Sequence, residues 1–310
     1  MRISVIIPTW NRMETLRLVL ESLARQRFYD MYEVLVCDSS STDGTEEMVY
    51  SLSVPYKLRY LCQENKGRSG ARNLGIQNAS GEYILFTDAD IIAHENLLNE
   101  HIKAHQRMSS RLQTYTAVVG CEIRVKDLAE LQYLHSHPEK QHEIHAPHRK
   151  FLPWYFFLTG NASVSRNLLE KVGVFDESFQ GYGMEDLELG YRISQADVDI
   201  IYNRKAINYH LHPVAFEERL KLKRQSGHSI VYFYHKHRDW RIKYALGLNP
   251  VSMALHSLFS RHGAWVSSCE REAKKNDGIW SSMCREILIQ YYYLIGVKEA
   301  LKKNEWKEQN

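Results

Sequence analysis

An α/β fold with a mostly parallel, doubly wound sheet is predicted for the first two thirds of the chain, followed by a helical extension. Three observations predict it. Short apolar, β-branched runs alternate with amphipathic segments over residues 3–90. Polar residues gather where each apolar run ends. From residue 214 onward only helical patterns remain.

The expected strands of the parallel part are four apolar runs, at residues 3–7, 33–37, 57–62 and 83–87. The first helix follows at once, with one apolar stripe made of Leu16, Val19, Leu20 and Leu23. Asn11 is expected to cap this helix, because Glu14 follows three residues later in capping-box register.

Farther along, the patterns predict helices at 95–108 and 185–195 and strands at 116–125 and 197–202. Residues 127–150 are polar and rich in histidine, and we interpret them as a long loop or lid with some helix. The expected domains are residues 1–213, which carry the site, and residues 214–310, the helical extension.

Composition narrows the class of protein. The chain has 310 residues, 44% of them hydrophobic, which is enough for a full core. No secretory signal is recognisable, and no apolar run approaches the ~20 residues needed to cross a bilayer, so we expect a cytoplasmic protein. The five cysteines are widely spaced without a C-x-x-C pair, which favours reduced thiols over a disulfide framework or zinc site.

The helical extension is basic. Residues 214–310 contain 17 Lys and Arg against 10 Asp and Glu, although the whole chain has a net charge of only +3. We expect a solvated helical face and no nucleic-acid partner. Three roles stay open for the extension: a cap on the catalytic domain, a homodimer contact, or peripheral contact with an anionic membrane surface. The aromatic residues considered for membrane contact are Tyr232, Phe233, Tyr234, Trp240, Tyr244 and Tyr291–Tyr293.

Ligands of open α/β sheets bind beyond the carboxyl ends of the strands. The first three strands are followed there by Pro8, Thr9, Asn11, Arg12, Asp38, Arg68 and Arg72. Glycines 67, 70 and 75 surround the last two arginines, which favours a turn that brings guanidinium groups to a diphosphate. Neither G-x-x-x-x-G-K-[ST] nor G-x-G-x-x-G follows the first strand, which argues against a P-loop NTPase and a dinucleotide dehydrogenase.

Asp88 and Asp90 follow the fourth strand and would point the same way in a regular strand. Close carboxylates repel each other unless a cation or a proton intervenes. Mg²⁺ and Mn²⁺ are commonly held by carboxylates together with substrate phosphates. The pair therefore predicts a divalent metal site, for which His210 and His212 are candidate further ligands.

Glu185 and Asp186 follow a glycine-rich aromatic loop and begin a helix. Acidic residues are frequent at helix N-termini because of the helix dipole, which accounts for one of them. A carboxylate at this position can also act as the general base that deprotonates an acceptor hydroxyl.

Together these motifs resemble the inverting glycosyltransferases of family 2, which have the GT-A fold. The resemblance covers residues 3–213. It includes V-I-I-P-T-x-N-R, D-S-S-S-T-D-G-T, G-R-S-G-A-R-N-L-G-I, G-E-Y-I-L-F-T-D-A-D, G-N-A-S and G-x-G-x-E-D. The segment F-D-E-S-F-Q-G-Y-G-M-E-D-L-E-L-G-Y-R also resembles the carboxy-terminal half of galactosyl- and N-acetylgalactosaminyltransferases.

The resemblance implies roles for the nucleotide and the metal. Asp38 would accept a hydrogen bond from the base, usually uracil, and Asp88 would lie by the ribose or the metal. Asp90 would ligate the metal that bridges the diphosphate, with His210 as a further ligand and His212 as second choice. The full set assigned to the nucleotide is Pro8, Thr9, Asn11, Arg12, Asp38, Arg68, Arg72 and Asp88.

The resemblance also implies roles for the sugar and the acceptor. Glu185 would bind sugar hydroxyls, and Asp186 would be the catalytic base. The residues expected to border the sugar and the acceptor are Gly160, Asn161, Tyr182 and Gly183.

The expected function is metal-dependent, inverting transfer of a hexose or N-acetylhexosamine from a UDP-sugar to a hydroxyl of a glycan, polysaccharide or other acceptor. One base without a second nucleophile implies a single displacement with inversion. One alternative is a sugar-phosphate nucleotidyltransferase, although Trp10-Asn11-Arg12 stands where such enzymes carry a glycine-rich basic loop. The other is a non-catalytic nucleotide-sugar-binding protein, against which the intact Glu185-Asp186 pair argues.

Overall fold

The computed structural model describes residues 2–109, 115–137, 140, 150–179, 182–211, 214–248, 250, 254, 263–275 and 278–303. The chain forms two compact units. The sheet unit comprises Met1–Glu177 and Glu185–Pro213, and the helical unit comprises Ser178–Met184 and Val214–Asn310. The short segment before Glu185 thus groups with the carboxy-terminal helices rather than with the sheet.

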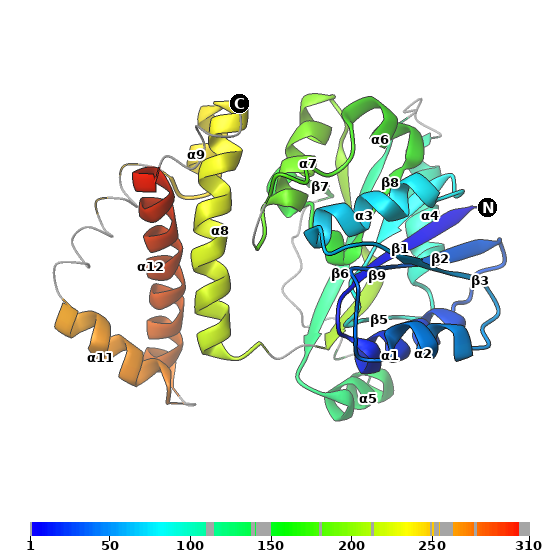
Figure 1. Ribbon diagram of the computed structural model, residues 1–310, viewed down its shortest axis with the longest axis horizontal. Coiled ribbons are helices and arrows are strands. Elements are labelled where there is room, and N and C mark those ends of the chain that lie inside the picture. Colours follow the sequence, from blue (N-terminus) through cyan, green and yellow to red (C-terminus); the bar gives the residue numbers. More distant parts are fainter. Residues whose placement is uncertain are drawn as a thin grey trace. The chain divides into compact units, whose positions relative to one another are not determined.

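The sheet has the strand order β3-β2-β1-β4-β8-β6-β9-β5, with β7 paired to β9 (Figure 1). Its parallel part is the predicted one, and it contains β1 (Ile3–Thr9), β2 (Tyr32–Asp38), β3 (Lys57–Cys62) and β4 (Tyr83–Phe86). The α/β fold is therefore confirmed, and its first half has the expected direction.

The second half of the sheet is mixed rather than parallel. Its strands are β5 (Ile91–Ala93), β6 (Ala117–Val125), β7 (Phe151–Leu152), β8 (Ala162–Ser165) and β9 (Ile200–Leu211). β8 lies between β4 and β6 and runs antiparallel to both, whereas β6 and β9 are parallel. β5 and β7 are antiparallel to β9. The parallel pattern of the first four strands therefore ends where β8 pairs with β4.

Helices cover both faces of the sheet (Figure 1). On one face lie α1 (Met13–Ala24), α2 (Thr45–Ser51) and α4 (Leu97–Ser109). On the other lie α3 (Gly67–Asn78), α6 (Arg166–Val172) and α7 (Glu185–Gln195). Alternate residues of β1 divide between the two cores: Ile3, Val5 and Ile7 pack with the first set, and Ile6 packs with the second. Both sides of β1 are buried, as a doubly wound sheet requires.

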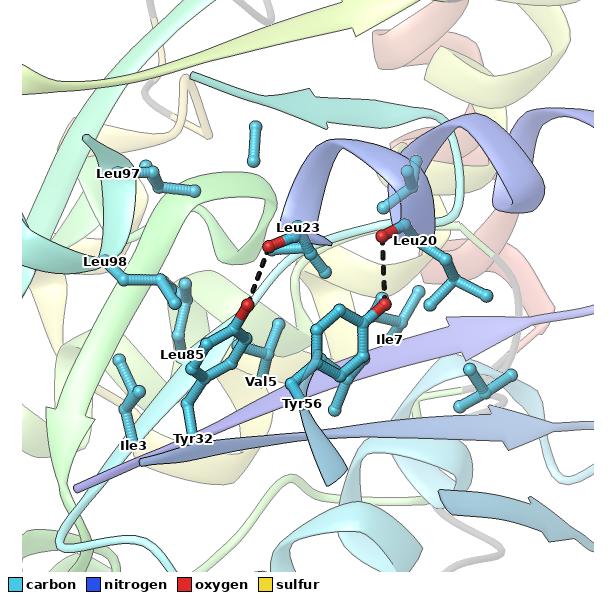
Figure 2. Close-up of a cluster of buried hydrophobic side chains, with 14 of the residues drawn as sticks. Ile3, Val5, Ile7, Leu20, Leu23, Tyr32, Tyr56, Leu85, Leu97 and Leu98 are labelled. Carbon is cyan, nitrogen blue, oxygen red and sulfur yellow. Dashed lines mark hydrogen bonds between the residues drawn. The ribbon is translucent and has the colours of Figure 1, made fainter. Parts of the chain in front are cut away.

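The core beneath α1 is closed by two tyrosines (Figure 2). Tyr32 donates its hydroxyl to the carbonyl oxygen of Leu23 at 2.7 Å, and Tyr56 donates to that of Leu20 at 2.9 Å. Carbonyls in the last turn of a helix have no partner within the helix. The Tyr32 hydroxyl supplies one for Leu23, so that the end of α1 is fixed on β2.

Two further segments complete the sheet unit near the site. α5 (Leu128–Ser136) lies within the region interpreted as a lid, of which residues 138–139 and 141–149 are outside the described part. The short 3-10 turns η2 (Trp154–Phe156) and η3 (Thr159–Asn161) lead into β8.

The helical unit contains α8 (Phe216–His237), α9 (Trp240–Ala245), α11 (Gly263–Ala273) and α12 (Ile279–Lys303). α8 and α12 cross closely at Gly227 and Gly296. Among the described helices, none combines the length and the apolar character that crossing a membrane requires.

Some of the aromatic residues considered for membrane contact in this extension are not available for it. Phe233 is fully buried, and Tyr293 is buried with its hydroxyl bonded to the carbonyl oxygen of Leu246. Tyr292 donates its hydroxyl to Glu270. These three rings therefore contribute to packing and hydrogen bonding within the helical unit.

Candidate active site

The ends of β1 and β2 are joined by side-chain hydrogen bonds. Asn11 has φ of 50°, and its amide oxygen accepts from the backbone N–H of Thr42 at 2.8 Å. Asp43 accepts from the backbone N–H of Met13 at 2.9 Å. The predicted cap is therefore corrected: Asp43, from the turn after β2, satisfies a free N–H at the start of α1, and Asn11 holds that turn in place.

The predicted nucleotide residues of β1 lie on this rim. Thr9 is the last residue of the strand, and its buried hydroxyl has no protein partner among the described residues. Pro8 is half-buried, and Arg12 is exposed at the start of α1. Their contacts with a nucleotide stay predictions.

Asp38 is the last residue of β2 and is fully buried. One carboxylate oxygen accepts from the backbone N–H of Ser41 at 3.0 Å and from its hydroxyl at 2.7 Å. The other accepts from the hydroxyl of Tyr60 at 2.7 Å. These three hydrogen bonds leave one acceptor site on the carboxylate, and the base contact stays a prediction.

Glycines bring α3 close to the sheet. A Cβ atom on Gly75 would lie 2.5 Å from Cγ2 of Ile6 and 2.9 Å from Sγ of Cys37, so a side chain there would push the helix away from β1 and β2. Arg68 lies exposed in the first turn of α3. Its predicted contact with a diphosphate remains a prediction.

Arg72, one turn farther along α3, is buried, with 2% of its side chain exposed. Its guanidinium donates to Asp88 at 3.0 Å and to Glu185 at 3.1 Å, and it lies over the ring of Phe175. The predicted diphosphate contact is therefore corrected. Arg72 is an internal cation that holds two acidic segments, because it lies buried between Asp88 and Glu185.

Asp88 and Asp90 lie beyond the end of β4, in the turn before β5. Regular strand geometry ends at Phe86, so the expected common direction of the two side chains is wrong. Asp88 turns to Arg72, whereas Oδ1 of Asp90 lies 3.6 Å from Nε2 of His210. The two aspartates therefore belong to different clusters.

His210 lies inside β9, which extends well past the predicted end of that strand. Its Nδ1 lies 3.0 Å from Oε1 of Glu122 on β6, and its Nε2 faces Asp90. Burial alone would lower the pKa of His210, but hydrogen bonds with the two carboxylates raise it to about 10. His212, the second choice, lies outside the described residues.

Glu122 was not predicted. The available signal was an acidic residue inside the apolar run 117–125. Its position beside His210 depends on a register shift: Gly120 pairs with Asn203, but the next residue, Cys121, pairs with Ile207. β-bulges of this kind re-aim side chains near active sites, and a sequence pattern does not reveal them.

The described residues contain no group of three or more His, Cys, Asp and Glu side chains placed to hold a metal ion. Asp90 and His210 do converge as a pair. Two protein ligands fit the manner in which Mg²⁺ and Mn²⁺ bind with substrate phosphates, since the nucleotide completes the coordination shell. The donor chemistry thus matches an ion brought in with a diphosphate.

Glu185 and Asp186 begin α7 as predicted. Glu185 is buried against Arg72, and a carboxylate oxygen of Asp186 accepts from the backbone N–H of Leu187 at 2.8 Å. Burial and the neighbouring Glu185 carboxylate raise the pKa of Asp186 to about 7, although Arg72 acts in the opposite direction. A carboxyl group with a pKa near neutrality can both accept and release a proton in catalysis.

Gly160 lies beside Glu122, the hydrogen-bond partner of His210. A Cβ atom there would be 2.7 Å from Oε2 of Glu122 and 3.0 Å from Cδ1 of Ile91. Its carbonyl oxygen accepts from the side-chain amide of Asn208 at 2.8 Å. The predicted proximity of Gly160 to a sugar stays a prediction, and its lack of a side chain leaves room for Glu122.

Asn161 points into the protein instead. Its amide nitrogen donates to the carbonyl oxygens of Cys121 and Ala206, and its oxygen bonds Nε2 of His101 at 2.8 Å. This side chain therefore serves the fold, because its buried amide is fully bonded, and the expected place of Asn161 at the border of the sugar stays a prediction.

Tyr182 and Gly183 belong to the helical unit. The carbonyl oxygen of Tyr182 accepts from the hydroxyl of Ser226 on α8 at 3.2 Å, and Gly183 has φ of 81°. Their contacts with sugar or acceptor stay predictions.

Comparison with known proteins identifies the family. Residues 4–173, more than half of the chain, match the model of glycosyl transferase family 2. Residues 141–214 match a model described as the N-terminal domain of galactosyltransferase. The uncharacterised glycosyltransferase YfnE of Bacillus subtilis (strain 168) is 30% identical over 253 residues, which cover 68% of this chain and 64% of YfnE. The chain thus spans somewhat less than two thirds of that relative.

Two solved structures share the fold. The mannosyltransferase PcManGT from Pyrobaculum calidifontis, in complex with GDP-Man and Mn²⁺, has a TM-score of 0.63 at 19% identity. The match covers 98% of this chain and 88% of the PcManGT chain. Residues 1–349 of TarS from S. aureus, in complex with UDP, have a TM-score of 0.54 at 16% identity, covering 98% and 92%. From the family match it follows that the chain belongs to glycosyl transferase family 2, and these neighbours show that it has the GT-A fold.

Proposed function

We propose that the chain transfers a hexose or N-acetylhexosamine from a UDP-sugar to a hydroxyl of a glycan, polysaccharide or other acceptor, with inversion and with a divalent metal. The observation that carries this proposal is the position of Asp186 at the start of α7, next to the buried pair of Arg72 and Glu185, with its pKa raised to about 7. TarS was solved with UDP and PcManGT with GDP-Man and Mn²⁺, which supports a nucleotide-sugar donor of this general kind.

The nucleotide would lie along the rim formed after β1, β2 and β4. Within the described part of the chain the buried hydroxyl of Thr9 has no protein partner, and such a group gains most from a ligand. Asp88 keeps about a third of its side chain exposed, 34%, and would face the ribose while it remains paired with Arg72. Exposed Arg12 and Arg68 would face the phosphates.

Asp90 and His210 would hold the metal. When bound there, Mg²⁺ or Mn²⁺ stabilises the negative charge that develops on the departing diphosphate. The protein contributes a carboxylate and an imidazole whose facing atoms already converge.

Asp186 would remove the proton from the acceptor hydroxyl. The acceptor oxygen then bonds to the anomeric carbon from the face opposite UDP while the bond from that carbon to the diphosphate oxygen breaks. The proton stays on Asp186, and the electron pair leaves with UDP. A single displacement inverts the anomeric centre, as one base without a protein nucleophile implies.

Family membership argues against a sugar-phosphate nucleotidyltransferase. A non-catalytic binding protein remains the competing proposal, because binding alone does not require a base. Asp186→Asn distinguishes the two: it should abolish transfer while UDP still binds. Asp197→Asn, in the exposed turn after α7, is the matched control and should transfer normally.

The experiment is a screen of nucleotide-sugar donors with Mn²⁺, scored by release of the nucleotide, followed by acceptor trials with the best donor. If Asp186→Asn turns over as fast as the natural protein, the assignment of the base is wrong. If no donor is consumed by either protein, the binding-protein proposal gains instead.

The role of the helical unit is also a proposal. Among its described residues, the large apolar side chains that are exposed are Trp240, Tyr244, Ile279, Trp280, Met283 and Leu301. They suit a membrane surface or a homodimer contact, whereas a cap on the catalytic domain needs no exposed aromatic rings. Co-sedimentation with anionic vesicles at two salt concentrations tests the membrane role, since electrostatic attachment weakens as salt rises.

A further inference from the structure

Glu122 forms a hydrogen bond with His210. Neither the sequence motifs nor the family match assigns a role to Glu122. Its carboxylate accepts from Nδ1 of His210 at 3.0 Å, on the side of the ring away from Asp90. The imidazole ring of His210 therefore lies between the carboxylates of Glu122 and Asp90. One nitrogen points toward Asp90, and the other is occupied by Glu122.

We propose that Glu122 is a positioning residue for the metal: it binds Nδ1–H of His210, so that the Nε2 lone pair faces the ion held with Asp90. This inference rests on the proposed metal-dependent transfer. Metal-bound histidines in proteins commonly donate their other N–H to a carboxylate, which fixes the tautomer and the ring plane.

The backbone is built to place Glu122 there. β6 and β9 are in register on both sides of the shift at Gly120 and Cys121, and residues 204–206 of β9 take up the difference. After the shift, Glu122 pairs with Asn208, and His210 lies two residues farther along β9. Glu122, Asn208 and His210 therefore share one face of the sheet. Without the shift, a different residue would stand beside the histidine.

Gly160 preserves the space that Glu122 needs. A Cβ atom at position 160 would be 2.7 Å from Oε2 of Glu122, which is too close unless the carboxylate moves. The side chain of Asn208 holds the Gly160 carbonyl at 2.8 Å, so the glycine backbone is itself fixed to β9. The carboxylate is thus confined between η3 and His210.

The test measures Mn²⁺ binding in the presence of UDP, by the loss of the free Mn²⁺ signal in electron paramagnetic resonance. Glu122→Ala should raise the Kd for Mn²⁺ about 10- to 100-fold, the range found when such supporting partners are removed. Glu122→Gln keeps an acceptor oxygen and should lose less. Glu170→Ala, on the exposed side of α6, is the control and should bind as the natural protein does.

Two further readouts separate positioning from a general structural role. Raising the Mn²⁺ concentration should restore transfer by Glu122→Ala toward the natural kcat, which a misfolded site would not allow. Gly160→Ala should weaken Mn²⁺ binding in the same direction, because its methyl group displaces the Glu122 carboxylate without changing any charge.

The outcomes are distinct. Unchanged Mn²⁺ affinity in Glu122→Ala overturns the inference and leaves the proposed transfer intact. If the natural protein transfers sugar without binding Mn²⁺ or Mg²⁺, both the metal assignment and the role of Glu122 fall, while the role of Asp186 stands. If no transfer occurs with any donor, the proposed function itself fails.

Discussion

Asp88 and Glu185 bind the same guanidinium, that of Arg72, although they come from opposite halves of the catalytic sequence. Asp88 follows β4, and Glu185 begins α7. One buried cation thus fixes the turn that carries the proposed metal ligand Asp90 relative to the helix that carries the proposed base Asp186.

We expect Arg72→Ala to destabilise the protein by about 3–5 kcal/mol, because it leaves buried Glu185 without its counter-charge. Arg72→Lys should recover only part of this, since an ammonium group lacks the two-armed geometry that reaches both carboxylates. Urea unfolding measures the change. Arg17→Ala, on the exposed face of α1, is the control. If the Arg72→Ala protein is as stable as the natural protein, the ion pairs of Arg72 with Asp88 and Glu185 contribute nothing to stability.

The pH dependence of transfer should report Asp186. The base must be ionised to accept the acceptor proton, and burial with the Glu185 charge raises the pKa of Asp186 to about 7. We therefore expect kcat/KM to rise with pH through about 7 and to fall about tenfold for each pH unit below it. The profile is measured at saturating metal. A rate that is level between pH 5 and 8 would exclude Asp186 as the base.

The raised pKa of Asp186 also predicts that its ionised carboxylate lowers the stability of the folded protein. A carboxyl group with a raised folded-state pKa binds its proton more tightly in the folded protein than in the unfolded chain. The folded state is therefore penalised progressively as pH rises from about 4 to about 7, and fully above that. Asp186→Asn removes the charge, so it should unfold at higher urea concentration than the natural protein at pH 8.

That advantage should shrink as pH falls from 7 toward 4, where Asp186 is protonated in both states. Asp197→Asn, which is exposed, should show no such trend. If Asp186→Asn is less stable than the natural protein at pH 8, the carboxylate is favourably placed in the folded state, and the raised pKa is wrong.

The sequence predicted the parallel half of the sheet and the polar residues that follow its strands, because both follow local rules. Apolar runs become buried strands, and polar residues after them share one rim. It failed where a residue's role depends on long-range geometry. Arg72 looked like a phosphate ligand, since nothing local shows that two carboxylates from distant segments enclose it.

Asn161 and Glu122 illustrate the same limit from two sides. Asn161 belongs to a recognisable motif, yet its amide completes a buried chain of hydrogen bonds through His101 to Ser163 and His105. Glu122 belongs to no motif, and only the register shift between β6 and β9 brings it to His210. Neither fact can be read from spacing along the chain.

The crossing of α8 and α12 gives a prediction for the helical unit. A Cβ atom on Gly227 would overlap the backbone oxygen of Tyr293, and one on Gly296 would overlap that of Arg224. Gly→Ala in a helix normally gains about 1 kcal/mol. Here the obstacle is backbone, which cannot rotate aside, so overpacking of about 1–3 kcal/mol should outweigh the gain.

Gly227→Ala and Gly296→Ala should therefore each lower the stability of the helical unit, and Gln290→Ala, at an exposed position of α12, should leave it unchanged or slightly raised. Far-UV circular dichroism during urea unfolding follows the helices directly. Because both glycines lie in one crossing, the double variant should cost less than the sum of the two, once the first alanine has separated the helices. Two alanines that each stabilise the protein would show that α8 and α12 do not cross at these glycines.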